Sequence, residues 1–296
     1  IRVAFRYPLR PVPKPEKPTM RALLFSALIL GAGLASAPAA AQTVLALNNS
    51  NTLLRFSAQA PGTLLATTPV TGLNAGDSLV GIDVRPATGA LFGLGSSGRL
   101  YTIDPVSGAA TAGPQLSVAL SGTSFGVDFN PVPDRLRVIS NTGQNLRINV
   151  ADGVAIVDGA INPAGFSVSG AGYINNFAGT TTTQLFNIDL TGSRLTTQNP
   201  PNDGTQVAIG ALGVTLDAGS EAGLDVRTAD GVNSAFATLR VGGTSGFYSI
   251  NTTSGAATLI GPIAGNPVVR GMALLDTGPT ISAPVPTTST WSLLLL

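Results

Sequence analysis

LVGIDVRPATGALFGLGSSGRLYTIDPVSGAATAG, residues 79–113, is the stretch that decides the fold. It contains four short segments suited to strands, at 79–84, 90–94, 99–104 and 109–113. PATG at 86–89 and PVSG at 105–108 separate them with proline and glycine, residues that favour tight turns. The strand period of two is clearest in a related segment, NLRINV at 145–150. We therefore expect four short strands joined by hairpin turns.

The same layout recurs along the chain. One pattern appears as GIDV at 81–84, GVDF at 126–129 and GLDV at 223–226, with weaker copies GYIN at 172–175 and GMAL at 271–274. The glycines that open these copies are 45, 46, 51 and 48 residues apart. A four-stranded propeller blade is about that long, roughly 40–50 residues.

A second pattern alternates with the first. It reads LRFS at 54–57, YTID at 101–104, LRIN at 146–149, FNID at 186–189 and YSIN at 248–251, and a glycine follows each copy within a few residues. An apolar strand that ends in a polar residue and a glycine indicates a strand running into a tight turn.

The two ends of this region complement each other. The last copy supplies one strand near 271–275, whereas the first part supplies strands at 43–47, 52–57 and 63–68 without a first strand. Joining them completes a blade and removes exposed sheet edges. We predict an all-β chain, a β-propeller of five four-stranded blades over residues 43–276, closed by pairing the N- and C-terminal strands. A six-bladed ring or an open solenoid is an alternative, because residues 206–218 could hold further strands.

The segments outside 43–276 suggest export. Residues 20–41 begin with Met20 and Arg21, continue with the apolar run ALLFSALIL and end in AAA, the layout of a signal peptide. The apolar run is shorter than the ~20 residues that span a membrane. We interpret residues 1–19, basic and proline-rich, as a non-native upstream extension. The Pro/Thr-rich tail at 277–296 resembles a truncated IPTL-type C-terminal sorting signal of Gram-negative bacteria, and an ordinary C-terminus is the alternative.

Several longer segments resemble one exported bacterial family. They are GIDVRP at 81–86, GVDFNP at 126–131 with DRLRV at 134–138, YINNFAGT at 173–180 and QNPPNDG at 198–204. With these segments the chain resembles the family called domain of unknown function 4394 over nearly all of residues 43–276. The resemblance implies no activity, so it assigns no functional residues.

Composition excludes several classes of function. The chain has neither cysteine nor histidine, which rules out disulfides, Cys/His zinc sites and Ser-His-Asp triads. Six of the 16 basic residues and one of the 15 acidic residues lie in residues 1–41, so the remainder carries a net charge of −4. A mildly acidic surface without basic runs argues against nucleic-acid binding.

The repeated aspartates Asp83, Asp128 and Asp225 are the best candidates for chemistry. If the first strand of each blade is innermost, they lie near the central channel. Three converging carboxylates could bind Ca²⁺, which prefers oxygen ligands, or could act as acid and base on a glycoside. A structural role, in which each carboxylate accepts backbone N–H groups within or between blades, explains a repeated position better.

Two further groups could bind a ligand. Arg135, Arg137 and Arg147 are expected on the outward-facing positions of adjacent strands in the second blade, where they could form an anion- or carbohydrate-binding patch, or simply a solvated face. Asn175 and Asn176 belong to the least regular copy, and irregular loops on a rigid scaffold often bind ligands, although ordinary turn chemistry explains them equally well.

These observations favour a non-catalytic binding module, without assigned catalytic residues, whose partner is an unknown protein or glycan. A carboxylate-based hydrolase or lyase working in the channel, with calcium as a possible cofactor, is one alternative. A structural envelope or matrix protein is another. We expect a monomer without a membrane span in its mature form, exported to the periplasm, cell surface or exterior of a Gram-negative bacterium.

Overall fold

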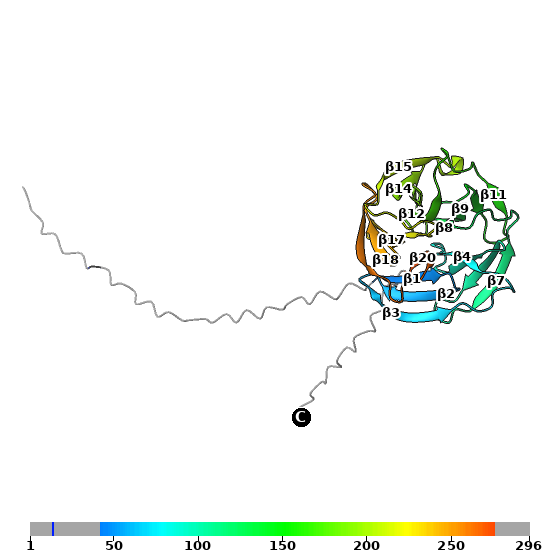
Figure 1. Cartoon of the computed structure of the whole chain (residues 1–296), viewed down its shortest axis with the longest axis horizontal. Helices are drawn as coiled ribbons and strands as arrows, with labels where there is room; N and C mark the ends of the chain where they lie inside the picture. Colours follow the sequence, from blue (N-terminus) through cyan, green and yellow to red (C-terminus); the bar gives the residue numbers. More distant parts are fainter. Residues whose placement is uncertain (1–13, 15–41, 276–296) are drawn as a thin grey trace, which may run out of the picture. The chain divides into compact units, whose positions relative to one another are not determined.

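The computed structural model describes Lys14 and residues 42–275, so the expectations for residues 1–19, 20–41 and 277–296 lie outside the described residues. From Gln42 onward the chain forms five four-stranded antiparallel sheets arranged in a ring (Figure 1). The predicted all-β, five-bladed propeller is confirmed. Within the described part of the chain, no helix has the length and apolar character needed to cross a membrane.

Each blade is one sheet, and its innermost strand is named first here. Blade 1 comprises β4 (Leu79–Val84), β5 (Leu91–Gly95), β6 (Arg99–Ile103) and β7 (Ala110–Gln115). Blade 2 comprises β8 (Phe125–Asn130), β9 (Arg135–Ser140), β10 (Asn145–Ile148) and β11 (Ala155–Val157). Blade 3 comprises β12 (Val168–Tyr173), β13 (Leu185–Asp189), β14 (Arg194–Gln198) and β15 (Gln206–Ala211), with the short 3-10 helix η1 (Pro201–Asp203) before β15.

The remaining blades complete the ring. Blade 4 comprises β16 (Gly223–Ala229), β17 (Val232–Val241), β18 (Thr244–Ile250) and β19 (Ala257–Pro262). Blade 5 comprises β20 (Val269–Leu275), β1 (Thr43–Asn48), β2 (Thr52–Ser57) and β3 (Ala60–Pro69). The inner strands β4, β8, β12, β16 and β20 lie against one another around the centre. We call the ring face where they begin the start face and the opposite one the end face.

The ends of the described chain close blade 5, as predicted. β1 pairs antiparallel with β20, from Thr43 opposite Leu275 to Asn48 opposite Val269. The Gln42 side chain adds a 2.8 Å hydrogen bond to the carbonyl of Leu275. This pairing gives the inner edge of β1 a partner, which an open ring would leave exposed.

The turns between third and fourth strands form as the second sequence pattern predicts. Oδ1 of Asp104 accepts the backbone N–H groups of Val106 and Ser107, both at 2.8 Å, and Asn251 forms the equivalent turn in blade 4. Gly108 ends the blade 1 turn with φ of 73°. A Cβ there would lie 2.3 Å from the carbonyl oxygen of Pro69 in blade 5, so only glycine fits where the blades meet.

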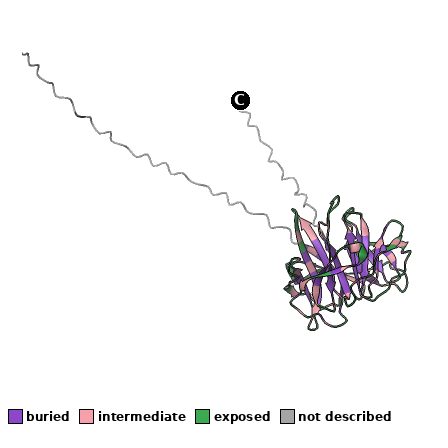
Figure 2. Cartoon of the chain, turned by 90° about the horizontal axis from the view of Figure 1, so that it is seen from above, coloured by how far each residue is buried: buried purple, intermediate pink, exposed green. Residues whose placement is uncertain are grey.

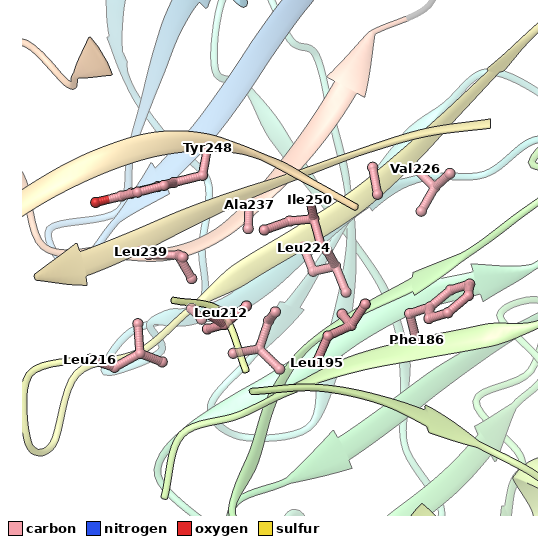
Figure 3. Packing of buried hydrophobic residues seen from close by; sticks show 13 residues of the cluster. Phe186, Leu195, Leu212, Leu216, Leu224, Val226, Ala237, Leu239, Tyr248 and Ile250 are labelled. Atoms are coloured by element: carbon pink, nitrogen blue, oxygen red, sulfur yellow. The ribbon is translucent and has the colours of Figure 1, made fainter. Parts of the chain in front are cut away.

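Apolar side chains fill the spaces between blades. In Figure 2 the buried residues occupy the strands, and the exposed ones lie mainly in the loops. Figure 3 shows one such interface, where Phe186 and Leu195 of blade 3 meet Leu224, Val226 and Ala237 of blade 4. Because each inner strand is covered on both sides, its residues are almost all buried, as in β8 and β12.

Blade 3 departs from the sequence prediction in two ways. FNID at 186–189 lies in β13, the second strand of its blade, whereas the other four copies lie in third strands. Gly170, not Gly172, matches the glycines that open the inner strands, because a bulge at Gly170 shifts the register of β12. The long connection between β12 and β13 displaces the second pattern. Residues 206–218 contain only β15, so they supply no sixth blade.

Candidate functional site

The three repeated aspartates meet at the centre of the ring. Asp83 on β4, Asp128 on β8 and Asp225 on β16 each place a carboxylate oxygen within 4.8 Å of the others. Their residues are only 1%, 1% and 2% exposed. The inner strands position them, because each aspartate follows the opening glycine of its strand by two residues.

Five backbone N–H groups donate to these carboxylates. Asp83 accepts the N–H of Val84 on Oδ1 at 2.7 Å and that of Phe129, in the next blade, on Oδ2 at 2.6 Å. Asp128 accepts the N–H of Tyr173, again in the next blade, on Oδ1 at 3.0 Å.

Asp225 repeats the arrangement of Asp83. It accepts the N–H of Val226 on Oδ1 at 2.6 Å and that of Leu274 in blade 5 on Oδ2 at 2.7 Å. Together the three carboxylates therefore serve one N–H group from each of the five inner strands.

The distribution of these bonds has a simple cause. An inner strand has no sheet neighbour on its channel side, so its edge N–H groups need another acceptor. Where the preceding blade carries an aspartate, that aspartate provides it. Blades 3 and 5 have Gly172 and Ala273 at this position, so the blades that follow them receive no aspartate acceptor from the preceding blade. In those following blades, blade 4 and blade 1, Asp225 and Asp83 instead turn Oδ1 back onto the N–H of their own next residue.

The electrostatics of the three aspartates are unfavourable to full ionisation. Burial raises the pKa of Asp83 well above its usual value, and the charge of Asp225 raises it further. Burial, followed by the charges of Asp83 and Asp225, raises the pKa of Asp128 in the same way. The backbone N–H groups act in the opposite direction, because they stabilise the charged form.

Access to the three aspartates is narrow from both sides. Toward the start face lies a space of about 10 Å³, lined by glycines and apolar residues of the inner strands, among them Gly81, Gly223 and Gly271. Toward the end face lies a space of about 30 Å³ beside Val84, Val226 and Leu274. A saccharide cannot reach carboxylates enclosed in this way. Binding of Ca²⁺ by these oxygens stays a prediction.

The arginines of blade 2 are arranged differently from the expectation. Arg137 is 1% exposed, so its predicted outward direction is wrong. Its guanidinium turns into the space between blades 2 and 3, because several acceptors meet it there. It donates to Asp158 at 2.6 Å, to Asn145 and Asn202 at 2.8 Å and to the hydroxyl of Tyr173 at 3.2 Å.

Arg147 and Arg135 lie at the margin of this network. Arg147 forms a two-point ion pair with Asp158 at 2.7 and 2.9 Å. Arg135 donates to the carbonyls of Pro133 and Asp134 near its own turn. The guanidiniums are thus held by groups of the protein, and a ligand-binding role for these three arginines stays a prediction.

Asn175 and Asn176 join blade 3 to blade 4. The N–H of Asn175 donates to Oδ1 of Asn233 at 2.9 Å, and Nδ2 of Asn233 donates back to Oδ1 of Asn175 at 3.1 Å. The N–H of Asn176 donates to the hydroxyl of Thr228 at 2.8 Å. These contacts give both asparagines a structural role at the end face, and their ligand-binding role stays a prediction.

The largest cavity described was not anticipated from the sequence. It has a volume of about 630 Å³ and opens on the start face, between the loops that precede β8, β12 and β16 and the start of β20. We call it the funnel. Its lining is mostly polar: Thr123, Ser124, Asn141, Ser167, Leu190, Thr191, Ser193, Thr215, Leu216, Asp217, Ala218, Gly219, Ser220, Glu221 and Arg270.

Three residues that line the funnel also carry buried polar atoms without a hydrogen-bond partner in the described part of the molecule. Ser124 and Ser220 are 6% and 9% exposed, and neither Oγ has a hydrogen-bond partner. Oε2 of Glu221 is also buried without a hydrogen bond, although Nε of Arg270 lies 3.5 Å away as an ion pair. Burial raises the pKa of Glu221, and the charge of Arg270 lowers it in part.

Unpaired buried polar atoms are costly, so those of a native protein need a physical reason. The sequence offered only a faint signal for this site: Glu221 is the one glutamate after residue 16. The serines are common loop residues, and nothing in the repeats connects Ser124, Ser220 and Arg270.

A second, smaller cavity lies at the end face beside blade 3. It has a volume of about 330 Å³, and its lining includes Asn130, Tyr173, Gln184 and Gln198. Both of its glutamine amides are already engaged, since Gln184 donates to Thr197 at 3.0 Å and Gln198 to the carbonyl of Pro201 at 2.6 Å. The funnel is therefore the better candidate for a ligand site.

Comparison with solved structures finds similar chains at low sequence identity. A chain of a nidogen/laminin complex is 9% identical with a TM-score of 0.48, and the match covers 79% of this chain and 98% of that one. Myxococcus xanthus glutaminyl cyclase is 17% identical with a TM-score of 0.42, covering 64% and 77%. A protein from Lactobacillus plantarum is 12% identical with a TM-score of 0.38, covering 80% and 100%.

The search of curated proteins found no match. A family model does match, over residues 52–273, which is most of the propeller. The segments that suggested the resemblance, from GIDVRP at 81–86 to QNPPNDG at 198–204, all lie within this range. The chain belongs to the family described as Domain of unknown function (DUF4394).

Proposed function

We propose that this protein is an exported, non-catalytic binding module that takes its ligand in the funnel on the start face. The observation that carries this proposal is the funnel itself, a cavity of about 630 Å³ with a mostly polar lining drawn from the loops of several blades. A concave site with several polar groups held in fixed positions is the usual form of a ligand pocket.

The arrangement of the aspartates supports binding over catalysis. A general acid or base must come within hydrogen-bond reach of its substrate. The carboxylates of Asp83, Asp128 and Asp225 are enclosed, and they already accept N–H groups from all five inner strands. Their arrangement favours a scaffold role, which keeps the ring closed beneath the funnel.

The funnel is suited to a small polar ligand or to a protruding polar group of a larger partner. Pockets of roughly 300–1,000 Å³ commonly hold small ligands, and this cavity falls within that range. Its walls come from several blades, so the loops that line it are held on a rigid frame.

A plugging variant tests this proposal. Ala218 is exposed and lines the funnel, so Ala218→Trp should fill the cavity while removing no described side-chain hydrogen bond. Ala87, exposed in the turn between β4 and β5 at the end face, gives the control Ala87→Trp. The probe is a library of neutral sugars, sugar acids, amino sugars and amino acids, screened by saturation-transfer NMR.

We expect at least one class of probe to bind the unmodified protein and Ala87→Trp, and binding to be lost in Ala218→Trp. A library without any binder, or binding that Ala218→Trp leaves intact, would overturn the proposal. Circular dichroism of both variants verifies that each remains folded.

A further inference from the structure

The last strand of the ring ends at the end face, close to the smaller cavity beside blade 3. β20 ends at Leu275, and the preceding Leu274 lines the central space of about 30 Å³ together with Asn176. Asn176 belongs to the connection between β12 and β13, and the strand residues at both ends of that connection, Tyr173 and Leu185, line the cavity of about 330 Å³. A segment that follows Leu275 therefore has this cavity within short reach.

We propose that the end-face cavity binds the C-terminal segment of the same chain, with the side chain of Trp291 as its occupant. The proposal goes beyond the binding function of the funnel, which opens on the opposite face, and does not depend on it. Residues 276–290 provide a tether of 15 residues, which spans up to about 50 Å when extended. A compact domain of the size of residues 42–275 has a radius of gyration of about 17 Å, so the tether is long enough.

The segment and the cavity match in charge. Residues 277–296 contain no aspartate, glutamate, lysine or arginine. No charged side chain is found among the described residues that line the cavity. A charged group that entered this cavity would lose its hydration without gaining a counter-charge, whereas a neutral segment avoids that cost.

An indole ring suits the cavity better than the leucines that follow it in the sequence. The lining is mostly polar, and it includes two exposed amides, those of Gln184 and Asn199. The Asn199 side chain makes no hydrogen bond to the described residues, and the Gln184 amide uses its nitrogen as donor to Thr197. Both amides thus retain a carbonyl oxygen as acceptor, and an indole combines a large apolar ring with one N–H donor.

Exposed apolar side chains near the cavity suit the four leucines at 293–296. Val132 is 44% exposed, and its N–H donates at 3.1 Å to Oδ1 of Asn130, which lines the cavity. Phe177 is 47% exposed and lies in the connection between β12 and β13. Leucines that cover these side chains would remove apolar surface from water.

The fluorescence of Trp291 reports the proposed contact directly, because this is the single tryptophan of the chain. The measurement is the emission spectrum of the full chain and its quenching by acrylamide, in buffer and in urea. We expect the folded chain to emit at a shorter wavelength and to be quenched several-fold less than the unfolded chain. Equal exposure of the indole in buffer and in urea would overturn the proposal.

A cavity-filling variant locates the contact. Asn199→Phe fills the cavity and removes no described side-chain hydrogen bond. The matched control is Asn74→Phe, since Asn74 is exposed in the loop that leads into β4 and its side chain also makes no described hydrogen bond. We expect Asn199→Phe to make Trp291 as accessible as in urea, Asn199→Ala to give intermediate quenching, and Asn74→Phe to match the unmodified chain.

Circular dichroism verifies that the three variants remain folded. A protected indole that Asn199→Phe leaves protected would lie elsewhere, and the proposal would be wrong. Protection that disappears on dilution would also overturn it, because the segment would then bind a second copy of the chain. None of these results bears on the funnel, whose function is tested separately with Ala218→Trp.

Discussion

Asp128 differs from its two repeats in how its carboxylate is used. Asp83 and Asp225 each accept two backbone N–H groups, one on each oxygen, whereas the bond described for Asp128 uses only Oδ1. An asparagine at 128 can keep the bond to Tyr173 while it removes one of three buried charges. Asparagine has only one side-chain oxygen, so at position 83 or 225 its NH₂ group must face one of the two backbone N–H groups.

This difference predicts opposite effects at neutral pH. Asp128→Asn should leave the free energy of unfolding unchanged or raise it, whereas Asp83→Asn should lower it by about 1–3 kcal/mol, the cost of an unpaired buried donor. Urea denaturation at pH 7 measures both variants, with Asp225→Asn as a second copy of Asp83→Asn. Equal destabilisation at positions 83 and 128 would contradict this account of the aspartates.

The dependence of stability on pH follows from the same charges. The folded-state pKa values of Asp83 and Asp128 are raised, so the folded chain holds protons that the unfolded chain, with an Asp pKa near ~3.9, has released. The contribution of these two groups to the free energy of unfolding should therefore be fully present below the unfolded pKa and be lost as pH rises through the folded values. Asp128→Asn should flatten this slope.

An opposing effect operates at lower pH. The hydrogen bond from Arg85, with its charge, lowers the pKa of Asp134, so that pair stabilises the fold above the unfolded pKa and loses its effect as pH falls. Urea midpoints measured from pH 2 to pH 8 separate the two arms. A midpoint that rises steadily from pH 4 to pH 8 would exclude the raised pKa values as the dominant influence.

At the scale of single elements, the turn glycines should differ in how well they tolerate alanine. Gly108 and Gly231 have similar φ values, 73° and 75°. A Cβ at Gly108 would meet the carbonyl oxygen of Pro69 at 2.3 Å, whereas a Cβ at Gly231 meets no atom within 4 Å. Alanine at 231 therefore pays for the left-handed backbone alone, about 1–2 kcal/mol, and alanine at 108 adds a clash with a neighbouring blade.

We expect Gly108→Ala to lower the free energy of unfolding by clearly more than Gly231→Ala does. Urea denaturation of the two variants measures the difference, which reports the contact between blades separately from the turn itself. Equal losses would mean that the blades shift apart at the rim without cost.

The elements also show where the sequence was sufficient. In blade 1 the strand predicted at 79–84 matches β4, and the turn residues Asp104 and Gly108 act as predicted, because period, polar residue and glycine all agree there. The prediction for blade 3 was wrong in part, because the long β12–β13 connection and the bulge at Gly170 changed the spacing on which the repeat was aligned.

The candidate sites divide in the same way. Repetition revealed Asp83, Asp128 and Asp225, because residues at the same position of the inner strands all lie around the centre of the ring. The funnel depends on Ser124, Ser220 and Arg270, which are brought together only by ring closure. The direction of Arg137 was missed because its partner Asp158 lies after the next two strands and could not be paired with it from alternation alone.

At the scale of the whole molecule, stability depends on closing the ring. β20 supplies the inner strand of blade 5, and it also supplies the N–H of Leu274 to Asp225. A chain ending at Pro267 lacks this strand, leaves the edge of β1 unpaired and exposes its buried residues, among them Val44 and Leu45.

We expect this shortened chain to lose cooperative thermal unfolding and to bind a hydrophobic dye, whereas a chain ending at residue 276 should unfold as the full chain does. A synthetic peptide covering residues 268–276 should restore part of the transition when added to the shortened chain. A cooperative transition without the peptide would show that four blades and three strands suffice.

The closing strand pair also determines how the molecule responds to tension. Thr43 and Leu275 are paired with each other at one end of an antiparallel ladder. A force that pulls the two chain ends apart would therefore load the hydrogen bonds one after another, as in opening a zip, instead of all at once in shear. The propeller should thus peel apart under a small load applied at its ends, and any attachment that bears force is better placed on one end than on both.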